Sequence, residues 1–296
     1  MKLFWTLVVV AVLGGCMYVS DSAEGEAPLR LTAIDVGQGL AVLLEWDGRH
    51  AMYDFGPDSV GVVDSLVARG VDTLDWVVLS HFHRDHIGGF IELPGRGVFV
   101  RHLYVGPDTS CGFFCDSVLR VARAMGSLVD TILRGENVQF GAGGEAGSGN
   151  ACEVAGGECP RFEVLWPTRY TRVGENRASV VLLGRLGVGK LLLTGDLDSV
   201  GERQLLEMNP TLSAELLQVG HHGSAGSNTL KFLSQVSPKY AFVSVGAGNR
   251  YGHPAPSVVR KLNLVLEDST KLFRTDLQGS IMFEMYSDMG VVVASP

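Results

Sequence analysis

The stretch Ser80-His81-Phe82-His83-Arg84-Asp85-His86 decides how this chain is interpreted, and it directly follows the apolar run Trp76-Val77-Val78-Leu79. A short apolar run of this kind is typical of a buried strand. Side chains alternate along an extended segment, so His81 and His83 can share one face, and a following turn can bring the aspartate and the last histidine beside them. Imidazole and carboxylate bind zinc, manganese or iron, and four such ligands so close together favour a site for two ions. Solvated histidines on a strand surface are the alternative.

Length and composition describe a well-packed globular protein. The chain has 296 residues, 46% of them hydrophobic and 19% charged, which is enough for one large domain or two small ones. No linker separates two cores, so we expect a single domain. The formal net charge of −8 excludes a global attraction to nucleic acid or anionic lipid. It weakens a nuclease interpretation, although a local basic groove stays open.

The first 28 residues have the pattern of an export signal and a tether. A lysine at position 2 precedes the apolar run Leu3 to Leu13, which is too short to span a bilayer as a helix and is typical of a signal peptide over residues 1–15. Cys16 follows two glycines as in a bacterial lipobox, so it is the predicted lipidation site, with a flexible tether over 16–28. An ordinary signal peptide is the alternative. We expect a periplasmic lipoprotein of the cell envelope, and Met17 favours the outer membrane over the inner one.

Export changes the meaning of the other cysteines. Cys111 and Cys115 lie four residues apart, and Cys152 and Cys159 lie seven apart. In an oxidising compartment four cysteines suggest two disulfides, and local pairing within each pair is the interpretation we favour among three connectivities. A zinc site at these cysteines is the weaker alternative, because neither pair has two-residue spacing.

From Leu29 onward, strands and helices alternate in two successive blocks, which predicts a layered α/β fold with sheets inside and helices outside. A glycine-rich segment over about 141–160 is predicted to be a surface insertion. The expected strands are Leu29 to Asp35, Ala41 to Trp46, Arg49 to Asp54, Trp76 to Leu79, Val98 to Val105, Phe162 to Trp166, Ser179 to Arg185, Lys190 to Leu193, Glu215 to Val219, Tyr240 to Val245, Leu272 to Phe273 and Ser280 to Met285. The expected helices are Ser59 to Arg69, Asp116 to Met125, Val200 to Met208, Asn228 to Gln235 and Ser257 to Leu266.

The His-x-His-x-Asp-His pattern after a buried strand resembles the signature of the metallo-β-lactamase superfamily. The resemblance runs from about Leu29 to Met285. It implies a four-layered αββα sandwich, here over residues 29–290, with a site for two divalent ions, zinc or manganese, along one edge. By the same resemblance His81 and His83 hold one ion, whereas Asp85 and His86 hold the other.

Further motifs follow in the order that this resemblance implies. Tyr53-Asp54-Phe55-Gly56 resembles the segment whose aspartate supports the metal loop, although Asp54 could instead cap the turn. Thr194-Gly195-Asp196, after three leucines, resembles the segment that supplies the metal-bridging aspartate.

The last ligand is implied by His221-His222-Gly223-Ser224, which resembles the segment that gives the second ion its final histidine. Both His221 and His222 are candidates.

A narrower resemblance links the chain to the extracytoplasmic hydrolase domain of the DNA-uptake channel ComEC and to stand-alone secreted hydrolases of that subgroup. It implies supporting roles for Asp35 and Ser224 and a role for His253 as a leaving-group acid or a loop brace. The motifs are Asp35-Val36-Gly37-Gln38-Gly39, Gly88-Gly89, His221-His222-Gly223-Ser224, Asn249-Arg250-Tyr251-Gly252-His253-Pro254 and Arg274-Thr275-Asp276 through Gly279.

Two departures from the pattern affect the expected site. Leu40 stands where the subgroup usually has aspartate, so any polarity supplied there is missing. Many superfamily members have another histidine before the bridging aspartate, but His102 lies in an apolar strand and reads as a strand residue. The subgroup tends to show Asn and Ser instead, here Asn176 and Ser179. The first ion is then held by three protein ligands, or is a loosely bound manganese.

Together these features predict a hydrolase in which a metal-bound hydroxide attacks phosphorus or a carbonyl carbon. Asp85 and His253 are candidates for the acid that protonates the leaving group. We expect a phosphodiester substrate, with single-stranded DNA as one option, and a membrane contact through the lipid anchor. DNA uptake would require a separate ComEC-like channel as partner. The alternatives are a carboxylic ester or lactone hydrolase of the same fold and a non-catalytic envelope binding protein.

Overall fold

A computed structural model describes residues 27–107, 112–141, 158–169 and 175–295. The signal peptide, the lipidation site Cys16, most of the tether and most of the glycine-rich insertion lie outside the described residues. So do Cys111 and Cys152. Cys115 and Cys159 are disulfide-bonded, but because their predicted partners lie outside the described residues, the pairing stays a prediction.

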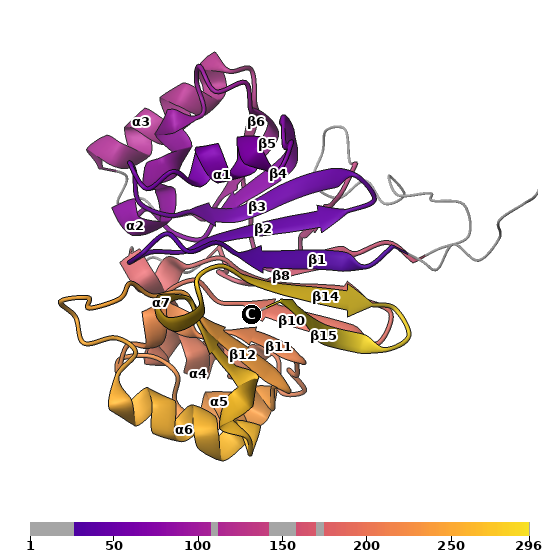
Figure 1. Cartoon of the computed structure of the whole chain (residues 1–296), viewed down its shortest axis with the longest axis vertical. Coiled ribbons are helices and arrows are strands. Elements are labelled where there is room, and N and C mark those ends of the chain that lie inside the picture. Colours follow the sequence, from indigo (N-terminus) through magenta and orange to yellow (C-terminus); the bar gives the residue numbers. More distant parts are fainter. Residues whose placement is uncertain (1–26, 108–111, 142–157, 170–174, 296) are drawn as a thin grey trace, which may run out of the picture.

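Two mixed β-sheets face each other (Figure 1). In the described part of the chain the first sheet has eight strands. Their order is β15 (Gly290–Ser295), β14 (Ile281–Tyr286), β1 (Leu29–Ala33), β2 (Ala41–Trp46), β3 (Arg49–Phe55), β4 (Thr73–Leu79), β5 (Phe99–Val105) and β6 (Leu128–Thr131).

The second sheet has seven strands among the described residues. Their order is β13 (Leu272–Arg274), β12 (Tyr240–Val243), β11 (Leu216–Gln218), β10 (Gly189–Leu193), β9 (Val181–Leu186), β8 (Arg161–Trp166) and β7 (Asn137–Gln139). Strands β10 to β13 are mutually parallel, whereas β7 to β10 are antiparallel.

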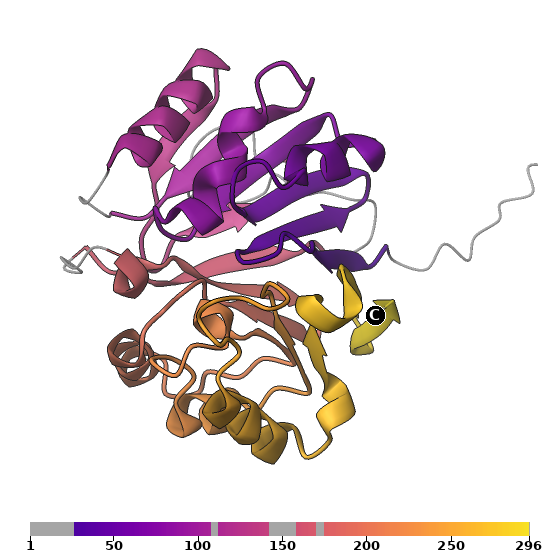
Figure 2. The same ribbon diagram turned by 60° about the vertical axis from the view of Figure 1, so that its left-hand side comes forward.

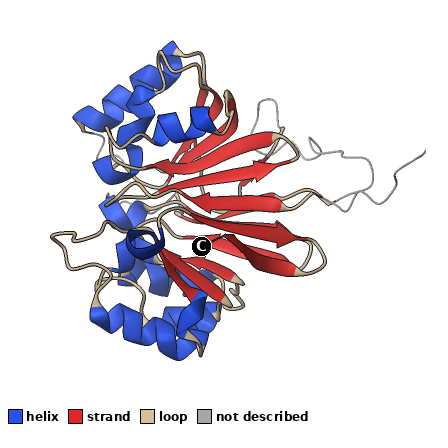
Figure 3. Ribbon diagram, viewed as in Figure 1, coloured by secondary structure: helices blue, strands red, loops and turns tan. Residues whose placement is uncertain are grey.

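Helices cover the outer face of each sheet, as Figures 2 and 3 show. The helices on the first sheet are α1 (Val62–Ala68), α2 (Arg84–Ile87), η1 (Gly88–Glu92) and α3 (Phe113–Ala124). Those on the second are α4 (Ser199–Met208), α5 (Leu230–Val236) and α6 (Pro256–Leu266). The short segments η2 (Glu175–Ala178), η3 (Gly220–Gly223), η4 (Ser269–Lys271) and α7 (Thr275–Gln278) complete the elements. The predicted αββα sandwich in a single domain is confirmed.

Three clusters of buried apolar side chains hold the two sheets and the two layers of helices together. Between the sheets, Trp76 and Phe162 meet with ring centroids 5.0 Å apart, and both are fully buried. A second cluster packs the first sheet against its helices, and a third does the same for the second sheet. Burying each large apolar side chain contributes about 1.5–3 kcal/mol relative to exposure, so these clusters fix how the sheet edges are positioned.

Some elements differ from the sequence-based expectations. Strands β6, β7 and β15 were not predicted, and β15 pairs with β14 so that the sheet continues to Ser295, past the expected limit at residue 290. Helix α1 begins at Val62 rather than Ser59, because Ser59 and Gly61 both have positive φ and cannot continue a right-handed helix. Within the described residues, none of the helices has the length and apolarity needed to cross a membrane.

Candidate metal centre

The predicted ligands meet at one edge of the sandwich because of strand direction. Strands β3 and β4 are parallel, as are β10 and β11, so their carboxyl ends lie side by side within each sheet. The two edges are joined where the Val180 N–H donates to the carbonyl oxygen of Ser80 at 2.8 Å. The segments that follow β4, β10 and β11 therefore converge, on the side where Figure 1 shows α2.

A first group of possible metal ligands consists of His81, His83 and Asp196, whose donor atoms lie within 4.8 Å of one another. The two histidine rings have centroids 4.5 Å apart. His81 and Asp196 are buried, whereas His83 is partly exposed. The strand-like spacing of the two histidines thus places both imidazoles at one point, as expected from the sequence.

A second group consists of Asp85, His86 and His222, again within 4.8 Å of one another. The Nε2 atom of His222 lies 3.4 Å from Oδ2 of Asp85 and 3.3 Å from Nε2 of His86. Asp85 and His86 stand in the first turn of α2, which follows the histidine pair directly. The turn after β4 therefore separates the four local ligands into two neighbouring sites.

Asp196 lies between the two groups. Its Oδ1 is 3.2 Å from Nε2 of His86, and its Oδ2 is 3.9 Å from Nε2 of His81 and 3.6 Å from Nε2 of His222. Its side chain is only 2% exposed. One carboxylate thus faces imidazoles of both groups, which is the arrangement that a bridging ligand requires.

Asp54 supports the metal loop from behind. Its carboxylate accepts hydrogen bonds from the backbone N–H and the hydroxyl of Ser80, at 2.7 and 2.6 Å, and contacts Nδ1 of His86 at 2.7 Å. The carboxylate fixes Nδ1 as the donor of that ring, which leaves the Nε2 lone pair pointing into the site. These contacts are the ones that a supporting residue would make, and the role of Asp54 stays a prediction.

The segment after β11 holds His222 in an unusual backbone conformation. His221 and His222 both have φ of 52°, in the left-handed region, which costs free energy for a non-glycine residue. The Asn228 side chain holds this turn, because it accepts from the Gly220 N–H at 3.0 Å and donates to the Gly220 carbonyl at 2.8 Å. The Nδ1 atom of His222 lies 2.8 Å from the backbone oxygen of Ser244, so its Nε2 also points into the site.

The donor set fits cations. With Nδ1 of both His86 and His222 used as donors, two Nε2 lone pairs face each other at 3.3 Å, which is unfavourable unless a proton or a cation lies between them. In the described part of the chain, Nε2 of His81 and Oδ1 of Asp196 are buried without a hydrogen-bond partner, and such atoms are costly to leave unpaired. Imidazole and carboxylate ligands suit zinc, manganese and iron. Two His/Asp groups are therefore compatible with a binuclear metal site.

The pKa shifts within the cluster show how strongly its carboxylates and imidazoles interact. Burial acts to raise the pKa of Asp196, but the neighbouring His86 and His222 outweigh it and hold that pKa well below the ordinary value. Burial acts to lower the pKa of His86, but Asp196 and Asp54 outweigh it and raise the pKa well above the ordinary value. Because imidazole binds an ion through an unprotonated nitrogen, ion binding competes with protons at this cluster.

The structure separates the two candidate histidines. His222 belongs to the second group of ligands, whereas His221 lies beside the centre, with Nε2 3.7 Å from Oδ2 of Asp196 and its side chain 27% exposed. Asn176 lies next to His221, with Nδ2 3.3 Å from the ring nitrogens. Ser179 accepts from the Asp196 N–H at 3.1 Å. Asn176 thus lies beside His221, and Ser179 contacts the backbone of Asp196; their supporting roles stay predictions.

Two predicted supporting residues lie away from the ligands. The exposed Asp35 side chain accepts from the Gly37 N–H at 3.1 Å, and the Ser224 hydroxyl accepts from the Gly226 N–H at 3.3 Å. In the described part of the chain neither side chain hydrogen-bonds to a candidate metal ligand, because both short polar groups are used locally in their own turns.

His253 is also removed from the candidate ligands. Its ring is 5.9 Å from that of His221, centroid to centroid. His102, read as a strand residue, contacts Asp130 at 2.7 Å and stacks on Tyr104. Leu40 is fully buried in the core between the sheets, so it contributes packing at the position where the subgroup has aspartate.

The glycine motif before Leu40 has a role that the sequence did not reveal. A Cβ on Gly39 would stand 2.5 Å from the backbone oxygen of Asp85, and the Leu40 N–H donates to that same oxygen at 3.1 Å. Only glycine permits this approach. The motif thus holds the backbone of a ligand-bearing turn. Ser80 and Ser244 are further contacts missed by sequence analysis, since no motif marks a serine as the partner of a histidine ring.

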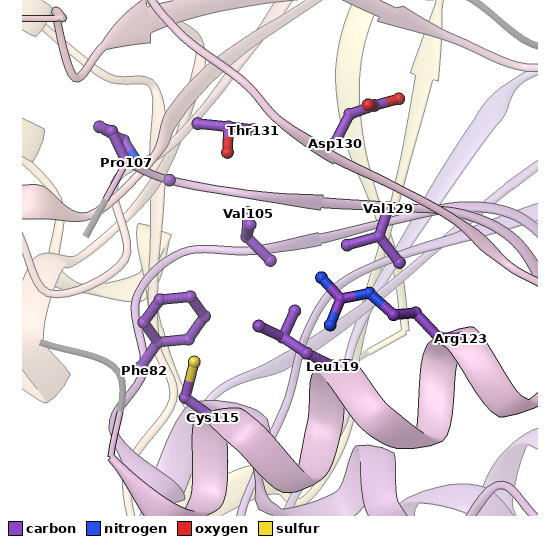
Figure 4. A pocket seen from close by; sticks show the side chains of 10 residues that line it. Phe82, Val105, Pro107, Cys115, Leu119, Arg123, Val129, Asp130 and Thr131 are labelled. Carbon is purple, nitrogen blue, oxygen red and sulfur yellow. The ribbon is translucent and has the colours of Figure 1, made fainter. Parts of the chain in front are cut away.

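A pocket of about 450 Å³ lies beside the metal loop (Figure 4). Phe82, which stands between the two histidines of the first group, forms one wall. Residues of β5, β6, α3 and the segment directly after β5 form the others. Arg123 extends from α3 along the apolar wall, as Figure 4 shows. No candidate metal ligand lines this pocket within the described residues, so it is a separate feature from the centre.

Comparison with known families and proteins agrees with the fold. Residues 34–247 match the model of the metallo-beta-lactamase superfamily. The chain is 29% identical over 300 aligned residues to ComE operon protein 3 of Bacillus subtilis, with 95% of this chain and 35% of that protein covered. It is 33% identical over 278 residues to competence protein ComA of Neisseria gonorrhoeae, with 93% of this chain and 35% of that protein covered.

The chain thus spans about a third of the length of these curated relatives. Among solved structures, the metallo-beta-lactamase fold protein YhfI of Bacillus subtilis has a TM-score of 0.55 at 12% identity, with 87% of this chain and 99% of that chain covered. At that identity the likeness concerns the fold alone.

Proposed function

Since the chain belongs to the metallo-β-lactamase superfamily, we propose that it is a metal-dependent phosphodiesterase whose substrate is a nucleic acid strand in the cell envelope. The observation that carries the proposal is the position of Asp196 between two groups of ligands, within 3.9 Å of His81 and 3.2 Å of His86. Two ions held this way, when bound, would lower the pKa of a shared water and stabilise charge on the transferred phosphoryl group.

The chain's own residues supply position and polarity. Asp54 holds the His86 ring through Nδ1, and the Ser244 carbonyl holds the His222 ring in the same way, so both Nε2 atoms are fixed before an ion or substrate arrives. His221 and Asn176 lie at the first group, and among the described residues the Asn176 Oδ1 has no hydrogen-bond partner. These two side chains are placed to contact substrate oxygens next to the centre.

Asp85 is better placed than His253 to position the donor that protonates the leaving group. The Asp85 side chain is 35% exposed at the centre, whereas the His253 ring lies 5.9 Å from the ring of His221, centroid to centroid, and is in neither group of candidate ligands. Burial acts to raise the pKa of Asp85, but the hydrogen bond to His222 and the nearby His86 hold it below the ordinary value. In the proposed reaction Asp85 orients a proton donor, and His253 braces the neighbouring loop.

The choice of a nucleic acid rests on the resemblance to the DNA-uptake channel ComEC and on the relatives, one of which is named as a competence protein. The formal net charge of −8 gives no long-range attraction to a polyanion, so binding would depend on local contacts at the centre. We also propose that the chain is exported and anchored through Cys16, and that a separate membrane channel would be its partner if it acts in DNA uptake.

Hydrolysis of bis(p-nitrophenyl) phosphate by the full chain with manganese or zinc tests the reaction class. We expect turnover that is lost in Asp85→Ala and retained in Asp64→Ala, because Asp64 lies on α1 and pairs with Arg96 at the surface. p-Nitrophenyl acetate serves as the carboxylic ester. Turnover of the ester alone would replace the proposal with an esterase. No turnover of either substrate by folded, metal-loaded protein would favour a binding role.

A further inference from the structure

The loop after β12, residues 246–254, presents an exposed aromatic ring at the side of the metal centre. Tyr251 is 54% exposed. Its ring stacks on that of His253, with centroids 5.7 Å apart and planes 24° apart. The Arg250 guanidinium lies 5.0 Å from the Tyr251 ring centroid and donates to the tyrosine hydroxyl at 2.9 Å. This tyrosine is therefore held by its neighbours and yet is not used in the core.

Asn249 fixes the shape of this loop. Its Nδ2 donates to the backbone oxygens of Gly246 and His253 at 2.9 and 2.6 Å, and its Oδ1 accepts from the N–H groups of Tyr251 and His253 at 3.1 and 3.0 Å. One partly buried amide thus satisfies four backbone groups across the loop. The position of the tyrosine is set before any ligand binds, which lowers the entropic cost of binding.

A row of three rings, Tyr251, His253 and His221, joins the loop to the centre. The ring of His253 lies 5.9 Å from the ring of His221, centroid to centroid. Nε2 of His221 lies 3.7 Å from Oδ2 of Asp196, the carboxylate between the two groups of ligands. A group attached to a phosphate at the centre would therefore reach the tyrosine along this row of rings.

We propose that Tyr251 and Arg250 form a stacking platform for the base of a nucleotide that flanks the scissile phosphate. This inference rests on the proposed phosphodiesterase function and deepens it. An exposed aromatic ring stacks on the face of any base, and an adjacent arginine can contact a phosphate or stack as well. The guanidinium charge disfavours a quaternary ammonium headgroup, which aromatic sites without a competing cation bind.

Binding of a single-stranded dodecamer with hydrolysis-resistant phosphorothioate linkages to the metal-loaded full chain tests the platform by fluorescence anisotropy. Tyr251→Ala is expected to raise the Kd by roughly 5- to 150-fold, the equivalent of about 1–3 kcal/mol per stacked base. Tyr251→Phe keeps the ring and is expected to retain most of the affinity. Phe99→Ala is the matched control, because Phe99 is 38% exposed at the start of β5, at the opposite end of the sheet from the centre.

An abasic site moved along the dodecamer separates stacking from a loss of loop structure. At one position the missing base should raise the Kd of the unchanged chain. The same abasic strand should bind Tyr251→Ala as tightly as the intact strand binds that variant, because the stacking contact is already lost. Equal loss of affinity for intact and abasic strands in Tyr251→Ala would overturn the platform, as would unchanged binding in that variant or an unchanged chain that binds no dodecamer.

Hydrolysis of bis(p-nitrophenyl) phosphate, measured in parallel, keeps the two proposals apart. Hydrolysis without any dependence of DNA binding on Tyr251 would reject the platform alone. Tyr251-dependent binding without hydrolysis would reject the phosphodiesterase and leave the platform in place.

Discussion

Replacing Asp54 by asparagine should weaken ion binding without unfolding the protein. The carboxylate of Asp54 contacts Nδ1 of His86 at 2.7 Å and accepts from the Ser80 hydroxyl at 2.6 Å and from the Ser80 N–H at 2.7 Å. An amide has one acceptor oxygen in place of two, so in Asp54→Asn that oxygen can keep the backbone N–H while an NH₂ group faces the histidine. The His86 ring then loses the partner that fixes its donor at Nδ1.

The expected size of the effect follows from that single contact. A hydrogen bond to a charged group is worth about 1.5–3 kcal/mol, and loss of a partner behind a metal-binding histidine costs roughly 10- to 100-fold in affinity or activity. Zinc affinity is measured by competition with a chromophoric chelator. Thermal unfolding of the metal-free variant checks that the fold remains.

Asp64→Asn serves as the control for Asp54→Asn, because the Asp64 side chain is 57% exposed and pairs with Arg96 away from the centre. It should bind zinc as the unchanged chain does. If Asp54→Asn bound zinc as tightly as this control, the reasoning that Asp54 orients His86 for an ion would be refuted.

Three further changes test other parts of the site. Gly195→Ala would place a Cβ 2.7 Å from that of Ser80 at a residue with φ of 54°. The left-handed backbone and the crowding should lower the free energy of unfolding by about 2–5 kcal/mol. Chemical denaturation measures this, and an unchanged midpoint would contradict it. Glu202→Ala removes a buried carboxylate that accepts from the N–H groups of residues 228 and 229. The free energy of unfolding, measured by chemical denaturation, should fall by roughly 2–3 kcal/mol, and no fall would mean that the carboxylate is dispensable. His222→Ala should reduce the zinc content from two ions per chain towards one, whereas His221→Ala should keep both, as measured by mass spectrometry of the metal content. Loss of zinc in His221→Ala and retention in His222→Ala would mean that the two histidines have been assigned wrongly.

The ligands near the first motif could be predicted because they are local in sequence. His81 and His83 owe their convergence to strand alternation, and Asp85 and His86 to the turn that follows. Asp196 could be placed because Thr194-Gly195-Asp196 follows a buried strand and resembles the superfamily's segment with the bridging aspartate. In each case neighbouring residues determine the direction of the side chain, so the pattern in the sequence carries the geometry.

The choice between His221 and His222 could not be made from sequence. It depends on two consecutive left-handed residues and on the Ser244 carbonyl, which comes from another strand end. The sequence also did not reveal that the Asp35 carboxylate accepts a hydrogen bond within its own turn, away from the candidate ligands. Strand β6 has mostly exposed side chains at a sheet edge, so it lacks the apolar alternation that marks a strand.

Activity measured against bound metal tests the central claim most directly. The full chain, stripped with a chelator and titrated with zinc or manganese, would be assayed with bis(p-nitrophenyl) phosphate while the metal content is determined at each step. Hydrolysis should rise until two ions are bound per chain and should be absent in Asp196→Ala, because that carboxylate faces both groups of ligands. Hydrolysis by the stripped chain, or none with two ions bound, would contradict a binuclear phosphodiesterase.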